Sequence, residues 1–506
     1  MKKVYNNYYL IVALLLVPIM HGCDKGFEDM NIDPNQPTDV PVGFLLTSTQ
    51  AAAVDDIWDE WQNGRFGMVY SQYWAQNEYT DEDRYLLRQS QNNNFWTFWY
   101  AGHGTTSGSE VEGGGIINLQ TIINQLNERL ENDEVSSDNI DMVNNQIAVA
   151  RIFKVWMFQI ITDIYGDIPY FDALQGAENF SPKYDRQEAI YTDLLKELTE
   201  ANDQISLDAG SYGTADLIYN GDMDKWKKFC NSLKLRVAIR IADVKAEEAS
   251  SAIEEALAAG VFESNADDAL LRYLASPPNN NPLNEARKSR PDFAVSLTFT
   301  DKLNELNDPR LPAYAAPAAN TGLYQGMTYG LTRGEAAAIP LGNVSQPNPS
   351  TYDAESPGIL LTFSEVQFIL AEAAQRGFIA GNPADYYEEG IRASMEFWGI
   401  DDQTAISEYI NSNPYDAGNW RTSIGVQKWI ALYMQGIQGW IEYRRLDFGV
   451  LRLPAGGIPP GVTTNTVPTR INYPTDEQNL NNANYQQAVS EQGPDRLDTK
   501  VWWDVN

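Results

Sequence analysis

The sequence predicts a mainly α-helical protein, an α-solenoid of tetratricopeptide-like helix pairs with long irregular loops. Three observations indicate this fold class. Apolar residues recur every three or four positions in several segments, as on one face of a helix. Short connectors separate many of these segments, which favours packed helix pairs. Strand-like alternation of apolar and polar residues is sparse.

Composition supports a folded, soluble chain and excludes one class of partner. Of 506 residues, 43% are hydrophobic and 11% aromatic, enough for a packed core. The formal net charge is −33, with 36 Lys and Arg against 69 Asp and Glu. Such a field repels phosphate backbones, and no basic block relieves it. Nucleic acid is therefore not an expected partner.

The N-terminus has the features of a lipoprotein signal peptide, residues 1–22. Two lysines precede an apolar run over 10–20, which is too short for the roughly 20 residues of a spanning helix. The run ends at Gly22-Cys23, and cleavage there would leave a lipidated Cys23. Residues 23–40 then form a polar tether before a single domain, 41–506. The alternative is an ordinary secretory signal with an incidental cysteine.

Helical periodicity is clearest in three segments. One stripe runs from Val143 to Ile164, and another from Ile190 to Ile205, with Asp185 as its N-cap candidate. A third stripe runs over 226–241 and makes Cys230 a core thiol. Asp222 or Asp224 is expected to cap the N-terminus of this helix, just before Trp226. Further helices are expected near 43–62, 116–131, 246–259, 362–376, 383–397 and 420–446.

Two blocks lack this periodicity. Residues 275–350 contain ten prolines together with many Gly and Asn, and 453–475 form a second Pro/Gly cluster. Loops of this length inside a compact domain are often functional. The first block is predicted as a non-helical loop insertion that also carries aromatic residues.

Most catalytic chemistries lack the residues they need. His103 is the only histidine after the signal peptide, and no Gly-x-Ser-x-Gly elbow accompanies it. Zinc spacings, phosphate loops and dinucleotide fingerprints are also absent. We therefore predict no catalytic residue, no metal site and no cofactor.

Acidic residues leave two options open. A carboxylate pair suffices for glycoside hydrolysis, so an all-α glycoside hydrolase is the alternative function. Structural calcium is the other option, at the oxygen-rich clusters 81–83 and 220–224, although neither fits an EF-hand loop.

Aromatic residues in polar loops are the best candidates for ligand contacts. The chain has 13 Trp and 27 Tyr, and their rings offer flat apolar faces suited to sugars or peptide side chains. The alternative is that the rings pin a long loop onto the scaffold. The candidates form two groups. The first is Trp74, Tyr79 and Tyr85; the second is Tyr314, Tyr324 and Tyr329, flanked by Arg310 and Arg333, which could serve an acidic ligand.

A series of short motifs spans nearly the whole mature chain, although 275–350 contains none. They are NIDPNQPT (31–38), YGDIPY (165–170), PKYD (182–185), KW (225–226), NSLKLR (231–236), SEVQFILAEA (364–373), QKW (427–429), WIEYRR (440–445), RINYP (470–474) and KVWWD (500–504). In kind and order, this series resembles the SusD/RagB family of lipoproteins, in its SusD-like 2 branch.

The resemblance implies a SusD-like helical fold and a surface-exposed, lipid-anchored protein of the outer membrane. It implies binding of an oligosaccharide or a peptide and delivery to a TonB-dependent, SusC-like outer-membrane barrel, without catalysis. The motifs themselves look structural, because their charges lie within helices and are expected to pair. These charged residues are Glu365, Glu372, Glu442, Arg444 and Arg445.

Overall fold

The computed structural model describes residues 40–103 and 113–506. The signal peptide, Cys23 and most of the tether lie outside these residues. The chain divides into two compact units, Met1–Phe44 and Leu45–Asn506, and the second contains nearly all of the described residues. None of the helices in the described ranges is long and apolar enough to cross a membrane.

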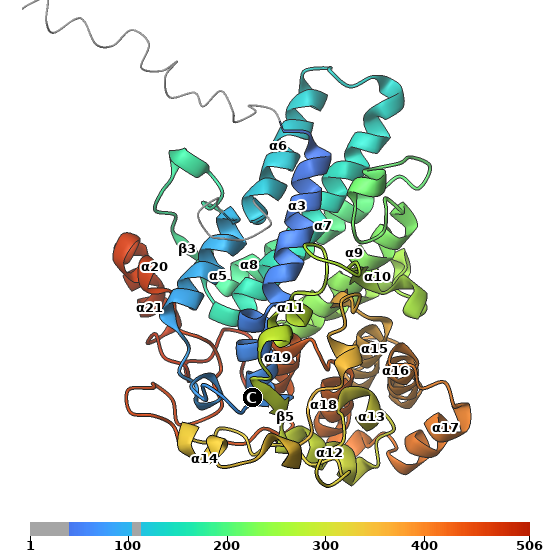
Figure 1. Cartoon of the computed structure of the whole chain (residues 1–506). Helices are drawn as coiled ribbons and strands as arrows, with labels where there is room; N and C mark the ends of the chain where they lie inside the picture. Colours follow the sequence, from blue (N-terminus) through green and yellow to red (C-terminus); the bar gives the residue numbers. More distant parts are fainter. Residues whose placement is uncertain (1–39, 104–112) are drawn as a thin grey trace, which may run out of the picture. The chain divides into compact units, whose positions relative to one another are not determined.

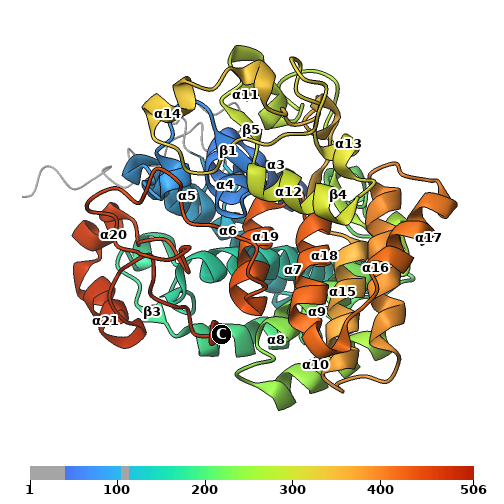
Figure 2. The ribbon, with the colours of Figure 1, turned by 90° about the horizontal axis from the view of Figure 1, so that it is seen from below.

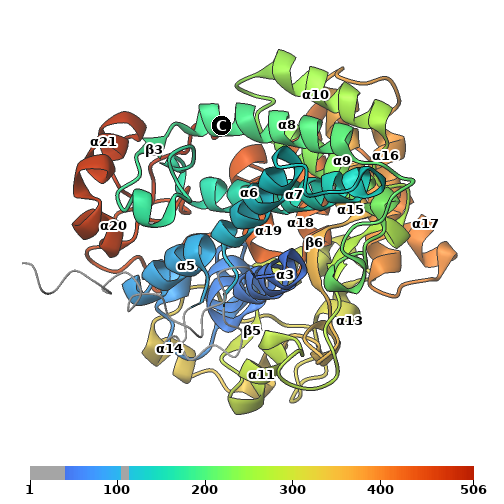
Figure 3. The same ribbon diagram turned by 90° about the horizontal axis from the view of Figure 1, so that it is seen from above.

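One series of helices forms the first half of the scaffold (Figures 1 and 3). Each helix packs against the next one in the chain, as the periodicity predicts. The apolar stripe from Val143 to Ile164 is buried. The series comprises α6 (Ile116–Glu131), α7 (Ile140–Tyr165), α8 (Gln187–Gln204), α9 (Met223–Arg240) and α10 (Ala246–Ala259).

A second series continues the scaffold on the other side of α9, which packs against α15. It comprises α15 (Phe363–Gln375), α16 (Pro383–Phe397), α17 (Gln403–Ser412), α18 (Trp420–Ala431) and α19 (Gly436–Leu446). The helix predicted over 420–446 is in fact two helices. Met434 adopts a left-handed conformation with φ 70°, which ends the helical path between α18 and α19.

Two N-terminal elements, the π-helix η2 (Glu60–Gly67) and α4 (Met68–Tyr70), pack against α19. Helix α3 (Val42–Trp58) leads into η2, and α4 is followed by β1 (Trp74–Gln76) and α5 (Gln89–Ala101). A side chain at Gly436 would overlap the backbone of Gly67 and Met68. Glycine is therefore needed where η2 crosses the start of α19.

The block 275–350 is more regular than predicted. It contains α11 (Pro282–Ser289), β5 (Phe293–Val295), α12 (Leu297–Leu306), α13 (Leu311–Tyr314) and α14 (Arg333–Ala337), grouped along one side in Figure 2. Asn281, Ser296 and Thr332 cap three of these helices through their side chains. Pro282 occupies the first turn of α11, where proline is tolerated. The prediction of a non-helical block was therefore wrong, because it relied on the number of prolines and not on their positions.

Three two-stranded antiparallel sheets fasten distant segments in the described part of the unit. Strand β1 pairs with β5 so that Gln76 lies opposite Phe293. The others pair β2 (Ile168–Pro169) with β3 (Tyr184–Asp185), and β4 (Ala269–Leu271) with β6 (Gly358–Leu361). Helices α20 (Thr475–Leu480) and α21 (Asn482–Gln492) close the chain.

Short 3-10 turns connect the longer elements. They are η3 (Glu82–Arg84), η4 (Ser137–Asn139), η5 (Gly176–Glu178), η6 (Gly213–Ala215), η7 (Asn265–Asp267), η8 (Leu341–Asn343), η9 (Pro349–Thr351) and η10 (Ala417–Asn419).

Two local predictions can be judged at helix starts. Asp185 is not the N-cap of α8: it accepts N–H bonds from Tyr170 and Phe171, and Asp167 Oδ1 instead accepts the Gln187 N–H at 2.8 Å. Asp222 does cap α9, accepting from Asp224 and Lys225. Cys230 is buried as predicted, and its thiol donates to the Leu198 carbonyl.

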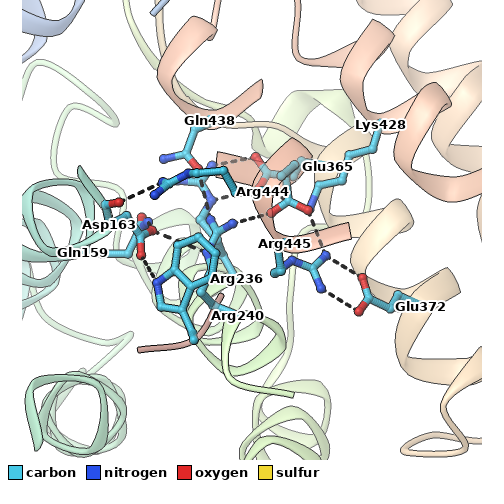
Figure 4. Close-up of polar contacts among 12 residues, drawn as sticks. Gln159, Asp163, Arg236, Arg240, Glu365, Glu372, Lys428, Gln438, Arg444 and Arg445 are labelled. Atoms are coloured by element: carbon cyan, nitrogen blue, oxygen red, sulfur yellow. Dashed lines mark hydrogen bonds and ion pairs between the residues drawn. The ribbon is translucent and has the colours of Figure 1, made fainter. Parts of the chain in front are cut away.

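A buried network of charges joins the two helical series (Figure 4). Arg236 pairs with Glu365 at 2.6 Å, which links α9 to α15. Glu442 of α19 accepts from Arg240 at 2.6 Å and Arg445 at 2.8 Å. Burial favours protonation of Glu442, but Arg445, Lys428 and Arg240 outweigh it and hold its pKa well below the ordinary value.

The predicted pairing of motif charges is confirmed, with one difference. Glu372 receives two bonds from Arg445, at 2.6 and 2.5 Å. Arg444 instead donates to the backbone carbonyls of Thr469 and Asp163 and stacks 3.8 Å from the Trp440 ring. These family motifs therefore hold helices together.

Candidate functional site

Five of the eight predicted ligand residues are buried. Trp74, Tyr314 and Arg310 are fully enclosed, and Tyr85 and Tyr329 are each 2% exposed. The middle block folds back on the scaffold and covers them. The five side chains pack inside the protein, as the alternative interpretation describes, and they present almost no exposed surface to a ligand in the structure.

Their partners explain the burial. Arg310 pairs with Asp308 at 2.6 Å and donates to Gln427 at 2.9 Å. The Tyr314 ring centroid lies 4.4 Å from that of Tyr433, whose hydroxyl accepts from Trp74 Nε1 at 3.0 Å.

Three candidates remain: Tyr79 and Tyr324 are partly exposed, and Arg333 is exposed. Tyr324 lies between α13 and α14, where its carbonyl accepts from Asn304 at 3.2 Å. Tyr79 follows β1 and belongs to a cluster of aromatic and arginine side chains. We call this cluster the Trp61–Tyr79 surface; it consists of Trp61, Arg65, Tyr79, Arg88, Arg290 and Arg333.

Guanidinium groups lie over both rings of this surface and leave part of each ring exposed. Around Tyr79, Arg290 lies 4.7 Å from the ring centroid, Arg333 5.6 Å and Arg65 5.8 Å. Around Trp61, Arg65 lies at 4.8 Å and Arg88 at 4.9 Å. Cation–π contact at these distances orients the arginines and holds N–H donors beside flat apolar faces.

The backbone explains why distant residues meet here. The β1–β5 pairing is extended by Asn77, which donates to the carbonyls of Asp292 at 3.0 Å and Pro291 at 2.8 Å. This places Tyr79 beside Arg290. Tyr79 itself has φ 52°, a conformation that non-glycine residues rarely adopt and that often marks functional sites.

Ion pairs fix the base of the surface. The Arg65 side chain is 3% exposed and contacts Asp292 at 2.8 Å, Glu60 at 2.7 Å and Glu82 at 3.4 Å. Burial raises the pKa of Glu82, although Gln76 and Arg65 favour its charged form. Arg88 and Arg333 remain exposed above this base.

The surface is shallow. A cleft of about 20 Å³ lies beside it, lined by Trp61, Arg65, Glu82, Leu87 and Arg88 among others. A neighbouring cavity of about 120 Å³ extends from Leu87 toward Val462 and Ile471. Partly exposed rings with adjacent donors suit the faces and hydroxyls of a sugar. Each carboxylate at the base is already paired with arginine, an arrangement suited to binding.

The predicted metal and acid–base candidates have protein partners. Glu82 Oε2 accepts from Gln76 Nε2 at 2.6 Å, and Asp83 accepts the backbone N–H groups of Gln76 and Gly330. His103 Nε2 lies 2.7 Å from Asp56 Oδ1. Within residues 40–103 and 113–506, no group of three or more His, Cys, Asp or Glu side chains is placed to hold a metal ion.

Comparison with known families decides the identity of the fold. A family model described as SusD-like, "starch-binding associating with outer membrane", matches residues 34–474. The chain belongs to the SusD-like family. No curated protein matches it significantly.

Solved structures agree with this membership. A chitin-binding protein is 31% identical to this SusD-like chain, with a TM-score of 0.79, covering 92% of this chain and 100% of its own. A SusD homologue from Bacteroides uniformis is 25% identical, with a TM-score of 0.77 and coverages of 92% and 100%. A chitin-binding SusD homologue from Flavobacterium johnsoniae is also 25% identical, with a TM-score of 0.76 and coverages of 92% and 98%.

Sequence reasoning missed most of the SusD-like chain's Trp61–Tyr79 surface. Trp61 lies at the end of the predicted helix 43–62, and Arg65 follows four residues later, a spacing that was a usable signal if the helix continued. Arg290 stands in the block 275–350, and nothing local indicated that β5 would bring it to Tyr79.

Proposed function

We propose that this SusD-like protein captures oligosaccharides at the cell surface and delivers them to a TonB-dependent, SusC-like outer-membrane transporter. The Trp61–Tyr79 surface carries the proposal, because it combines two partly exposed rings with guanidinium donors. Family membership supports glycan binding and association with the outer membrane. The chitin-binding relative at 31% identity makes chitin oligosaccharides the first ligands to test.

The protein is proposed to bind its ligand without cleaving it. The carboxylates at the base of this surface are Glu60, Glu82 and Asp292, and all three contact Arg65. A general acid needs a carboxyl group free to protonate a leaving oxygen. A shallow surface also suits release to a transporter, since affinity is governed mainly by the dissociation rate.

Anchorage is proposed through a lipidated Cys23, and a peptide remains the alternative ligand. Calorimetric titration with chitin oligosaccharides, neutral glucans and mixed peptides, followed by chromatography of the recovered ligand, tests the function. We expect an oligosaccharide to bind and to be recovered intact. Binding confined to peptides, or steady release of shortened sugars, would contradict the proposal.

A further inference from the structure

A larger cavity, separate from the two hollows beside the Trp61–Tyr79 surface, shares no residue with that surface. It has a volume of about 490 Å³, within the range of ligand sites. Its walls come from α6, α7, α8 and the segment between β2 and β3, which loops out beside α6 in Figure 1. The residues used below are Gln120, Asn124, Lys154, Phe171, Gln175 and Glu178.

An aromatic side chain stands at this cavity without being enclosed. Phe171 is 50% exposed. Its ring meets the Tyr170 ring edge-on at 4.9 Å, and Tyr170 in turn packs at 4.6 Å against Phe158. The ring is therefore held in place from behind while much of it faces solvent. Such a ring offers a platform for the apolar face of a sugar.

Part of the polar lining is fixed by internal bonds. Tyr170 donates to Asp193 at 2.8 Å, Lys154 to Gln120 at 3.2 Å, and Gln120 to Asn124 Oδ1 at 2.8 Å. The last of these bonds uses the amide oxygen of Asn124 and leaves its amide N–H groups without an acceptor in the described part of the chain. Among the described residues, neither those N–H groups nor the side chains of Gln175 and Glu178 have a hydrogen-bond partner.

The free groups match hydroxyl chemistry. The Asn124 amide donates, the Glu178 carboxylate accepts, and Gln175 can do both, as a sugar hydroxyl requires. Glu178 and Asp193 outnumber Lys154 among the charged lining residues, and the chain is strongly acidic, so an anionic ligand is disfavoured. Leu174 in the same loop adopts φ 64°, a further sign of a constrained wall.

We propose that this cavity is a second binding site, for a neutral sugar unit, formed by Phe171, Asn124, Gln175 and Glu178. It goes beyond the proposed function, because a chain with two sites can hold two oligosaccharides or two places on one polymer. Two linked sites raise the overall affinity for a long chain without new contacts.

Calorimetric titration of the full mature chain with chitotetraose, maltotetraose and cellotetraose tests the second site. We expect two equivalents of one sugar on the wild type and one on Phe171→Ala, with the remaining affinity unchanged. Tyr79→Ala should retain the Phe171-dependent equivalent. Phe180→Ala is the matched control, because Phe180 is 83% exposed on the same loop but does not line the cavity.

Three results would overturn the second site. One is a single equivalent on the wild type that Tyr79→Ala abolishes, which would leave the proposed function intact. Another is that none of the three sugars binds at the cavity, whereas a cationic peptide titrated in the same way does. If Phe171→Ala loses sugar binding and its melting temperature also falls, the loss could come from a damaged fold. Asn124→Leu is then titrated instead, and it should also lose one equivalent. Unchanged stoichiometry in that second variant also contradicts the proposal.

Discussion

Burial decides what a single charged side chain contributes to this fold. Glu442 is fully buried and contacts Arg240, Arg445 and Lys428, the last at 3.1 Å. Removing one member of a buried ionic group leaves charges that water cannot solvate, which is far more costly than losing an exposed pair.

Glu442→Gln should therefore lower the free energy of unfolding by roughly 3–5 kcal/mol. Glu188→Gln is the matched control, since Glu188 pairs with Lys245 at the surface. That change should cost at most about 0.5 kcal/mol. Urea denaturation measures both, and equal effects for the two variants would refute the role given to the buried network.

Asp268 should make stability depend on pH. Burial raises its pKa from 3.8 to about 7, although the Phe363 N–H bond favours the charged form. The folded protein then binds more protons than the unfolded chain between about pH 4 and pH 7, so stability falls as pH rises through that window.

Asp268→Asn should flatten this fall, by an amount on the order of a few kcal/mol over the window. The amide keeps the acceptor for Phe363 and removes the charge. Urea denaturation at a series of pH values measures the slope. An unchanged slope in the variant would show that Asp268 is not the group responsible; Asp55 and Asp83, whose pKa values burial also raises to about 7, would then come first.

At residue scale, exposure was the property that sequence predicted least well. Trp74 and Tyr79 stand five positions apart in the same polar segment, yet one is enclosed and the other partly exposed. The difference arises because β1 pairs with β5, a contact between residues more than 200 positions apart. Nothing near Trp74 in the sequence records that contact.

At the scale of elements, local periodicity was enough for most helices. Helices α6, α10 and α16 begin and end at the predicted residues, since a stripe of apolar side chains reports burial directly. The break between α18 and α19 was missed because it depends on one left-handed residue, Met434. The short helices of 275–350 were missed because their signals are caps and not stripes.

The crossing of η2 and α19 positions the Trp61–Tyr79 surface and can be tested through a glycine. Gly436→Ala should destabilise the fold by about 1–3 kcal/mol, because its new methyl group would overlap the backbone of Gly67. Gly210→Ala has open space around it and should change stability by less than about 0.5 kcal/mol. Thermal denaturation compares them; a neutral Gly436→Ala would mean that the two helices can move apart.

At the scale of the whole molecule, the proposed membrane anchor is the lipid on Cys23. Cys23→Ala should release the protein from the membrane fraction or leave it with its signal peptide, because several acyl chains are needed for stable anchoring. Fractionation and immunoblotting measure this in cells lacking the transporter, which removes indirect retention. Continued membrane association of a processed Cys23→Ala protein would exclude lipidation as the anchor.

The central claim is that the Trp61–Tyr79 surface binds oligosaccharide, and one calorimetric comparison tests it most directly. Wild type, Trp61→Ala, Tyr79→Ala and Tyr79→Phe are titrated with the sugar that binds best, and their melting temperatures are recorded. We predict that each alanine variant loses affinity at this site by roughly tenfold or more, since a stacking ring is lost, whereas Tyr79→Phe keeps most of it. Melting temperatures should stay unchanged. Wild-type affinity in both alanine variants would contradict the account.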